Sequence, residues 1–236
     1  ERTKREIPAP SDAAFDMRRR ELLEACELFL SEETKWCRTS TPRWFEVPFG
    51  RPVEEGKFGS SEPVTIDLGE GGEVMVVGQI DRIDECGTGR FKVWDYKSGS
   101  TYGFEDHEYL TKGKKIQHAI YSVATRELLR RAGIAGEVEE SGYYFPTRKG
   151  RARRIRRVPP FSGDEREALN IVLTGLLDTI HHGSFIHTVE EGDCKFCDFK
   201  AVCGGDIKQV AREAKEISKQ STDPGVVAFT RVGEVE

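Results

Sequence analysis

Two neighbouring segments rich in apolar and β-branched residues, joined by a short glycine-containing turn, constrain the fold of this chain most strongly. Residues 74–84 and 90–97 each have the composition of a strand, and the turn at 85–89 suits a β-hairpin. Asp95 and Lys97 are two positions apart, so both side chains point to one face of their strand. The hairpin brings Asp81 beside Asp95, which predicts two carboxylates and one ammonium on a single sheet face.

This charge pattern is unfavourable in a partly buried sheet unless something compensates it. A divalent cation does so, because Mg²⁺ prefers carboxylate oxygens and retains waters, one of which can become a nucleophile. Lys97 is then placed to orient that water or to stabilise charge that develops on a phosphate. The alternative is that these side chains are ordinary charges on the solvated face of an antiparallel strand.

The remaining pattern predicts further helices and strands around the hairpin. A second candidate pair lies in the predicted helix 114–132, where Gln117 and Tyr121 share one helix face at i, i+4 spacing. An amide and a phenol there can hold a nucleic-acid backbone or the catalytic groups, although such pairs are common on half-buried helices. The other expected helices are 11–37, 164–182 and 206–219, the other expected strands are 43–49, 63–68 and 137–145, and the tail from Ser221 is expected to be loosely held or partner-dependent.

Three motifs in this order, G-x-I-D-R-I-D at 78–84, D-Y-K-S-G at 95–99 and Q-x-x-x-Y at 117–121, resemble the PD-(D/E)XK nucleases, specifically their RecB-like branch. The resemblance spans roughly residues 40–205. It implies an α/β, restriction-endonuclease-like αβββαβ core with a central mixed sheet flanked by helices, followed by a cysteine-bearing helical extension.

The resemblance also implies roles for individual residues. Asp81 and Asp95 would ligate Mg²⁺ or Mn²⁺, Lys97 would serve the attacking water, and Gln117 and Tyr121 would form the accessory pair of the family. A further candidate metal ligand is Glu46, which sits where many members carry a strand glutamate near the metal, although a plain charge on an edge strand explains it equally well. Many RecB-like nucleases carry a metal-proximal histidine upstream of the first aspartate, whereas here the first histidine is His107.

A cysteine cluster follows the predicted core. Cys194, Cys197 and Cys203 have the x2 and x5 spacing of a metal site, which suits either zinc or an iron–sulfur cluster. Their likeness to the C-terminal trio of AddB-type helicase–nucleases and iron–sulfur CRISPR-associated nucleases implies a structural 4Fe–4S cluster, with zinc as the alternative. In those relatives an upstream cysteine completes the cluster; here Cys37, Cys26 or a cysteine before Glu1 could serve.

Residues 148–157 form a strongly basic segment that predicts phosphate binding with a marked salt dependence. The alternative is a solvated loop. The preceding aromatic residues 143–145 could stack on bases, but they are more typical of a core strand. The seven cations are Arg148, Lys149, Arg151, Arg153, Arg154, Arg156 and Arg157.

The formal net charge of the 236 residues, −5, excludes little, because charge is segregated into this basic segment and an acidic remainder. No stretch approaches the roughly 20 apolar residues of a membrane span. The chain begins at Glu1 rather than Met, and we expect it to be part of a longer polypeptide. The expected organisation is an N-terminal helical segment at 1–37, a nuclease core at 38–190, a cysteine-cluster extension at 191–220 and a tail at 221–236.

Together these features predict a Mg²⁺- or Mn²⁺-dependent deoxyribonuclease domain, with exonuclease action on single-stranded DNA ends favoured over endonuclease action. The expected setting is a recombination and repair protein with a helicase domain or subunit, located in the cytoplasm and with the nucleoid if the source is bacterial. One alternative is a non-catalytic DNA-binding or scaffolding module that keeps the fold and the cysteine-bound metal. Another is a zinc-stapled interaction domain in which the Asp-Tyr-Lys sequence is incidental.

Overall fold

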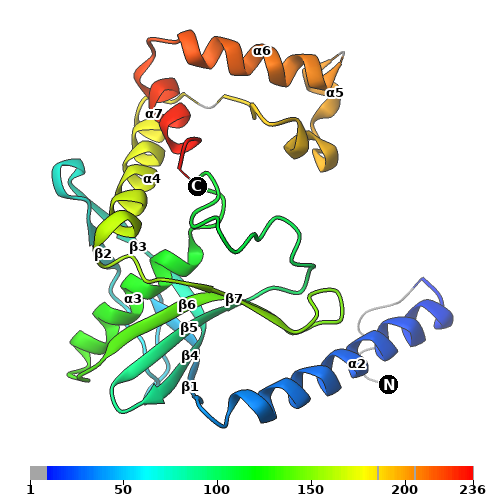
Figure 1. The fold of residues 1–236 in the computed structure, drawn as a ribbon, viewed down its shortest axis with the longest axis vertical. Helices are drawn as coiled ribbons and strands as arrows, with labels where there is room; N and C mark the ends of the chain where they lie inside the picture. Colours follow the sequence, from blue (N-terminus) through cyan, green and yellow to red (C-terminus); the bar gives the residue numbers. More distant parts are fainter. Residues whose placement is uncertain (1–9, 185, 205, 236) are drawn as a thin grey trace. The chain divides into compact units, whose positions relative to one another are not determined.

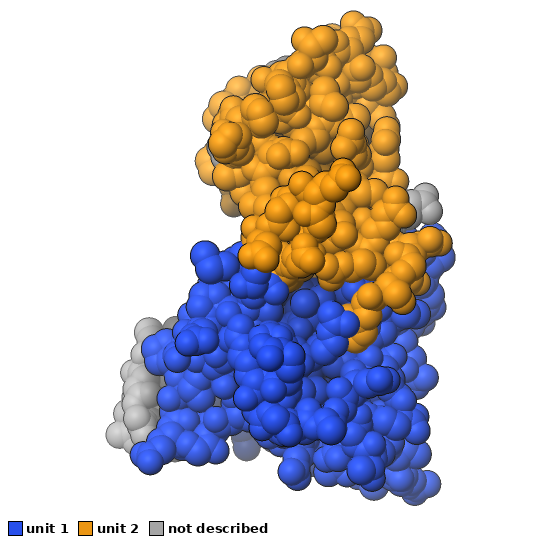
Figure 2. Space-filling model, turned by 90° about the vertical axis from the view of Figure 1, so that its left-hand side faces the viewer, with its two compact units in different colours: residues 1–65, 75–108, 117–160 blue, residues 66–74, 109–116, 161–236 orange. Residues whose placement is uncertain are grey.

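The computed structural model describes residues 10–184, 186–204 and 206–235. It divides into two compact units, which Figure 2 draws in different colours. Unit 1 comprises residues 1–65, 75–108 and 117–160, and unit 2 comprises residues 66–74, 109–116 and 161–236.

A five-stranded sheet forms the centre of unit 1, with the strand order β1-β4-β5-β6-β7 (Figure 1). Its strands are β1 (Thr41–Phe49), β4 (Gly78–Gly87), β5 (Arg90–Tyr96), β6 (Glu137–Phe145) and β7 (Arg153–Arg157). Only β5 and β6 run parallel within this sheet; its other neighbours are antiparallel. A parallel pair needs a crossover, and α3 (Gln117–Arg131) lies in the connection between the two strands.

Helices cover both faces of the β4–β5 hairpin. On one face, α2 (Asp12–Trp36) packs its last turns against the sheet, where Trp36 meets Trp94 with ring centroids 5.4 Å apart. On the other face, Gln117 at the start of α3 hydrogen-bonds to Lys97, just beyond β5. The predicted mixed α/β sheet flanked by helices is therefore confirmed.

The core of unit 1 sits where α3 packs on β5 and β6. Apolar and small residues at helical spacing on α3 are fully buried, including Ala119 and Ala124, and Gly133 closes the helix with a φ of 67°. The aromatic residues 143–145 of β6 are at most 1% exposed. They are core side chains, as the strand pattern favours, and they are not exposed to stack on bases.

The long segment 74–84 does not form the single strand that its composition predicts. Instead it divides at Val77 into β3 (Glu73–Val76) and β4, and β3 pairs with β2 (Val64–Asp67) in a separate two-stranded sheet. Gly78 marks the division, because a Cβ atom there would lie 2.7 Å from Cζ of Phe49.

Unit 2 is largely helical. Its helices are α4 (Gly163–His181), α5 (Lys200–Cys203), α6 (Ile207–Gln220) and α7 (Pro224–Val232), with short 3₁₀ turns η1 (Gly69–Gly71) and η2 (Glu191–Phe196). The described residues include no helix long and apolar enough to cross a membrane.

The prediction of a loosely held tail after Ser221 is wrong, because α7 is a capped helix with a buried side. Asp223 accepts a hydrogen bond from the backbone N–H of Val226 at 2.9 Å and so caps the first turn. Gly225, Ala228 and Val232 are buried. Close packing on α4 requires small residues, since a Cβ atom on Gly175 would lie 2.5 Å from Cγ2 of Val232.

Candidate active site

The register of the β4–β5 hairpin places the two predicted metal ligands face to face. Arg82 pairs with Trp94 and Ile83 with Val93, so the same register sets Asp81 opposite Asp95. The backbone N–H of Tyr96 donates to Oδ2 of Asp81 at 2.7 Å, which fixes that carboxylate at the strand end. The predicted proximity of the two carboxylates is thus confirmed.

Lys97 links this carboxylate pair to α3. Its Nζ lies 2.6 Å from Oδ2 of Asp95 and donates to Oε1 of Gln117 at 2.7 Å. The Gln117 amide donates in turn to the Tyr121 hydroxyl at 3.5 Å, and Tyr121 also meets Phe49 edge to face. The structure therefore brings four of the five predicted catalytic side chains into one continuous set of contacts, from Asp95 to Tyr121.

The Asp95 carboxyl is held in a setting that disfavours its charge. Its side chain is 3% exposed, and burial raises the pKa of Asp95 to about 6, with Asp81 adding to the rise and Lys97 opposing it. Oδ2 of Asp95 has the Lys97 ammonium as its charged partner, at 2.6 Å. A buried carboxylate that faces a second carboxylate and has one lysine beside it fits a site for a divalent cation.

Glu46 lies across the sheet from Asp81. The β1–β4 register pairs Phe45 with Arg82 and Val47 with Ile80, which sets Glu46 opposite Asp81. Its φ of 50° is a left-handed conformation that a non-glycine residue adopts at a cost of roughly 1–3 kcal/mol. Sequence reasoning missed Gln79, whose amide donates to Oε2 of Glu46 at 2.6 Å; its position two residues before Asp81 was the available signal.

The donor set suits a hard cation such as Mg²⁺ or Mn²⁺. Carboxylate oxygens from Asp81 and Asp95 are ligands that Mg²⁺ prefers, and it commonly uses only one or two of them alongside waters and substrate phosphates. Within the described residues, no group of three or more His, Cys, Asp or Glu side chains is gathered to hold a metal ion. The two facing aspartates therefore fit the metal, while Glu46 is near them in register without completing a triad.

The three predicted cluster ligands are free thiols. Cys194 lies on η2, Cys197 directly follows η2, and Cys203 ends α5. The N–H of Phe199 donates to Sγ of Cys197 at 3.4 Å. The three thiols are not gathered into a metal-binding group in the part of the chain that is described. Of the candidate fourth ligands, Cys26 and Cys37 are both exposed.

The basic segment forms the β6–β7 turn and β7, and it does not present all seven cations to solvent. The prediction that Arg154 binds phosphate is wrong, because its side chain is only 8% exposed. It pairs with Oε1 of Glu33 at 2.5 Å, and its guanidinium carbon lies 3.7 Å from the Tyr144 ring centroid. Arg157 is likewise 7% exposed and donates to the backbone oxygen of Glu105 at 2.6 Å. The exposed members are Arg148, Lys149, Arg151, Arg153 and Arg156.

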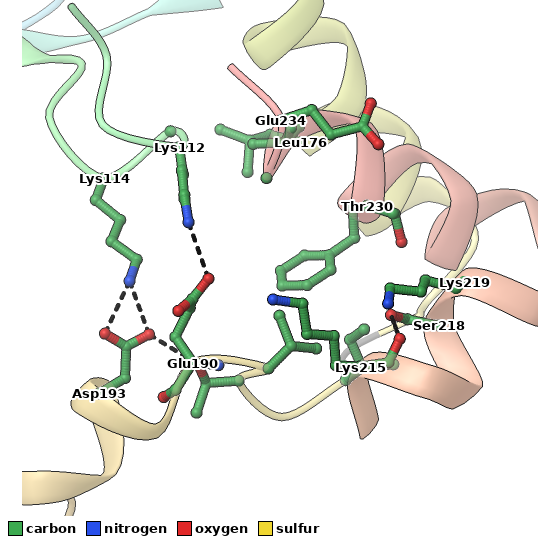
Figure 3. A pocket seen from close by; sticks show the side chains of 17 residues that line it. Lys112, Lys114, Leu176, Glu190, Asp193, Lys215, Ser218, Lys219, Thr230 and Glu234 are labelled. Carbon is green, nitrogen blue, oxygen red and sulfur yellow. Dashed lines mark hydrogen bonds and ion pairs between the residues drawn. The ribbon is translucent and has the colours of Figure 1, made fainter. Parts of the chain in front are cut away.

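Unit 2 also contains a cavity of about 550 Å³, which Figure 3 shows. Among its lining residues, Lys112 pairs with Glu190 at 2.9 Å and Lys114 with Asp193 at 2.8 Å. Its walls are mainly apolar and come from α4, α6, α7 and the loops beside them. None of the site residues predicted from the sequence lines it.

Comparison with known proteins identifies the family. The family profile described as the PD-(D/E)XK nuclease superfamily matches residues 1–204, which includes the whole β4–β5 hairpin and α3. No curated protein sequence matches the chain. Members of this superfamily are generally metal-dependent nucleases that act on DNA. The match covers most of the chain, which therefore belongs to the PD-(D/E)XK nuclease superfamily.

Proposed function

We propose that this chain is a Mg²⁺- or Mn²⁺-dependent deoxyribonuclease of the RecB-like branch. The observation that carries the proposal is the facing pair Asp81 and Asp95, with Lys97 in contact with Asp95 at 2.6 Å. A structural role explains these groups poorly, since two carboxylates face one another and one of them is buried. Metal-dependent hydrolysis of a phosphodiester uses cation ligands of this kind, and a nearby ammonium stabilises the charge that develops on the phosphate.

Each residue has a separate task in this proposal. Asp81 and Asp95 would hold the cation, which supplies Lewis acidity toward the phosphodiester when bound. The Lys97 ammonium would orient the attacking water and stabilise the negative charge that develops on the phosphate oxygens. Gln117 would fix the position of the Lys97 ammonium through their 2.7 Å hydrogen bond, and Tyr121 would orient the Gln117 amide.

We further propose that the substrate is a single-stranded DNA end, within a larger helicase–nuclease protein. The ordered motifs that resemble RecB-like nucleases support this, as do the five exposed cations of the β6–β7 turn and β7. Exposed lysines and arginines can follow a flexible phosphate backbone. An exonuclease leaves a closed single-stranded circle intact and degrades the linear form, so the two substrates together test this part directly.

We propose a 4Fe–4S cluster as the ligand of Cys194, Cys197 and Cys203, with zinc as the alternative. Their spacing and their free thiols support the assignment. Anaerobic purification followed by metal and acid-labile sulfide analysis tests it. Iron and sulfide that disappear in Cys197→Ser support a cluster; stoichiometric zinc without iron rejects it.

The nuclease proposal is tested with end-labelled single-stranded DNA in Mg²⁺ or Mn²⁺. We expect cleavage by the wild-type chain and a loss of about 10²- to 10³-fold in Asp95→Ala and Lys97→Ala. Glu54→Ala is the matched control, because Glu54 is an exposed acid that pairs with Lys57 outside the site. Equal activity in all variants, or no cleavage with either metal, would contradict the assignment. A chain that shifts DNA without cutting it would instead be a binding module.

A further inference from the structure

Tyr102 is a solvent-exposed aromatic residue on the loop that leaves the candidate active site. It follows Lys97 by five positions, and it is 91% exposed. The loop around it is anchored: the N–H of Tyr102 donates to Oγ of Ser100 at 3.4 Å, and the nearby Phe104 packs edge to face on Phe145 with centroids 5.0 Å apart. The Tyr102 ring is thus in solvent, while Phe104 of the same loop is anchored in the core.

The basic β6–β7 turn packs against the same loop. Thr147 donates to the backbone oxygen of Ser98 at 3.3 Å, and a Cβ atom on Gly150 would lie 3.2 Å from the backbone oxygen of Gly99. An ion pair between Arg153 and Asp106 joins the two segments farther along. The loop that carries Tyr102 and the turn that carries the cations therefore lie side by side.

Two cations of this turn are available to a ligand. Arg148 pairs with Glu24 and Arg153 with Asp106. In contrast, Lys149 and Arg151 are exposed and form no ion pair within the described part of the chain. Uncompensated positive charge and an exposed aromatic ring on adjoining segments are the components of a surface that binds single-stranded nucleic acid.

We propose that Tyr102 stacks on a base of single-stranded DNA while Lys149 and Arg151 neutralise phosphates next to it. A base in single-stranded DNA can offer its face to the phenol ring, whereas duplex bases are already stacked on their neighbours. Stacking tolerates any base, so the site would select for strandedness rather than sequence. The proposal rests on the proposed function for its substrate, and it adds the residue that distinguishes single strands from duplex.

Binding is measured by fluorescence anisotropy with a labelled single-stranded oligonucleotide and its duplex, in EDTA so that no strand is cut. We expect Tyr102→Ala to weaken single-strand binding about tenfold, which corresponds to the loss of one base–aromatic stack. Tyr102→Phe keeps the ring and should stay close to wild type. Duplex affinity should be the same in all three proteins. A second oligonucleotide carrying 2-aminopurine reports stacking itself: its fluorescence should be quenched by wild type and by Tyr102→Phe, but not by Tyr102→Ala.

Unchanged single-strand affinity and unchanged quenching in Tyr102→Ala would overturn the proposal. So would an equal loss on single-stranded and duplex DNA, because that pattern describes a backbone contact, and so would a wild-type chain that does not bind single strands. These outcomes are separate from the nuclease assay. A chain that fails to cleave can still show ring-dependent quenching, and a chain that cleaves through Asp95 can lack it.

Discussion

The two faces of the β4–β5 hairpin carry charged residues in opposite electrostatic states. On the face toward α2, Arg82 is 1% exposed, and it pairs with Asp84 at 2.5 Å and with Glu33 at 2.7 Å. Burial opposes the charge on Arg82, but its hydrogen bonds to Asp84 and Tyr96 raise its pKa. Arg154 pairs with Glu33 as well, so within this buried network two cations meet two anions and their charges balance.

The face toward α3 is not balanced. Asp81 and Asp95 face one another, Glu46 lies across from Asp81 in the register, and Lys97 is in contact with Asp95. Neighbouring residues of the same two strands therefore build a closed ion network on one side and an excess of carboxylate on the other. The fold thus balances the buried charges on one face and leaves an excess of carboxylate on the other, which is what the proposed cation site requires.

The largest effect is expected from a substitution in the buried ion network of the balanced face. Arg82→Met removes one partner of a buried network and leaves Asp84 and Glu33 without it, so the free energy of unfolding should fall by about 3–5 kcal/mol in urea denaturation. The matched control is Arg90→Met, because Arg90 pairs with Glu139 at the surface, and its effect should be small. Equal effects of the two substitutions would mean that the buried network contributes no more to the free energy of unfolding than a surface ion pair does.

On the unbalanced face, removal of a charge should increase the free energy of unfolding instead of lowering it. Asp95→Asn in EDTA at neutral pH should raise the free energy of unfolding by about 2 kcal/mol, since it removes a charge that the fold disfavours. Because the pKa of Asp95 is raised in the folded state from 3.8 to about 6, the wild type should lose stability as pH rises through that window. Asp95→Asn should lack this loss. Destabilisation by Asp95→Asn would refute the comparison.

A smaller effect should come from Gln79, which holds the Glu46 carboxylate opposite Asp81. Gln79→Leu should lower Mn²⁺ affinity about tenfold, as the loss of an outer hydrogen-bond partner does at metal sites, with little change in melting temperature. Gln209→Leu removes a similar amide–carboxylate hydrogen bond to Glu213 on α6 and should leave Mn²⁺ affinity unchanged. If Gln79→Leu also leaves it unchanged, Glu46 has no part in metal binding.

The smallest expected effects distinguish an arginine that binds DNA from one that stabilises the fold, both within the basic segment. Arg151→Ala should weaken binding to single-stranded DNA a few-fold and reduce the slope of log affinity against log salt by about 1. Arg154→Ala should instead lower the melting temperature, because Arg154 is buried between Trp36 and Tyr144. Anisotropy titrations at several salt concentrations, together with thermal melts, distinguish the two. Similar DNA-binding defects with unchanged melting temperatures would contradict this assignment.

The sequence predicts the hairpin and its carboxylates well because the relevant signals are local. A turn predicted at 85–89, which is confined to residues 88–89 in the structure, and a two-residue period are enough to bring Asp81 beside Asp95 and to put Lys97 on the same face. Helical spacing likewise places Gln117 and Tyr121 together. These placements follow from backbone periodicity without knowledge of tertiary packing.

Long-range packing accounts for what the sequence misses. Glu33 binds Arg154 across 121 positions of the chain, so nothing near Arg154 distinguishes it from the exposed arginines around it. Gln79 reaches Glu46 across 33 positions, through a strand pairing that only the folded sheet defines. The tail helix α7 is held by its fit against α4, where Gly175 lies against Ala228 and Val232, a contact between segments about 50 positions apart.

The most direct test of the unbalanced face is calorimetric titration of Mn²⁺ into the wild-type chain and into Asp81→Asn, with melting temperatures recorded with and without the metal. We expect wild-type binding that raises the melting temperature, and in Asp81→Asn the loss of both the binding and the thermal shift. Titration of the Cys197→Ser chain separates this site from the cysteines. Identical Mn²⁺ binding by wild type and Asp81→Asn would contradict the claim that these facing carboxylates form a metal site.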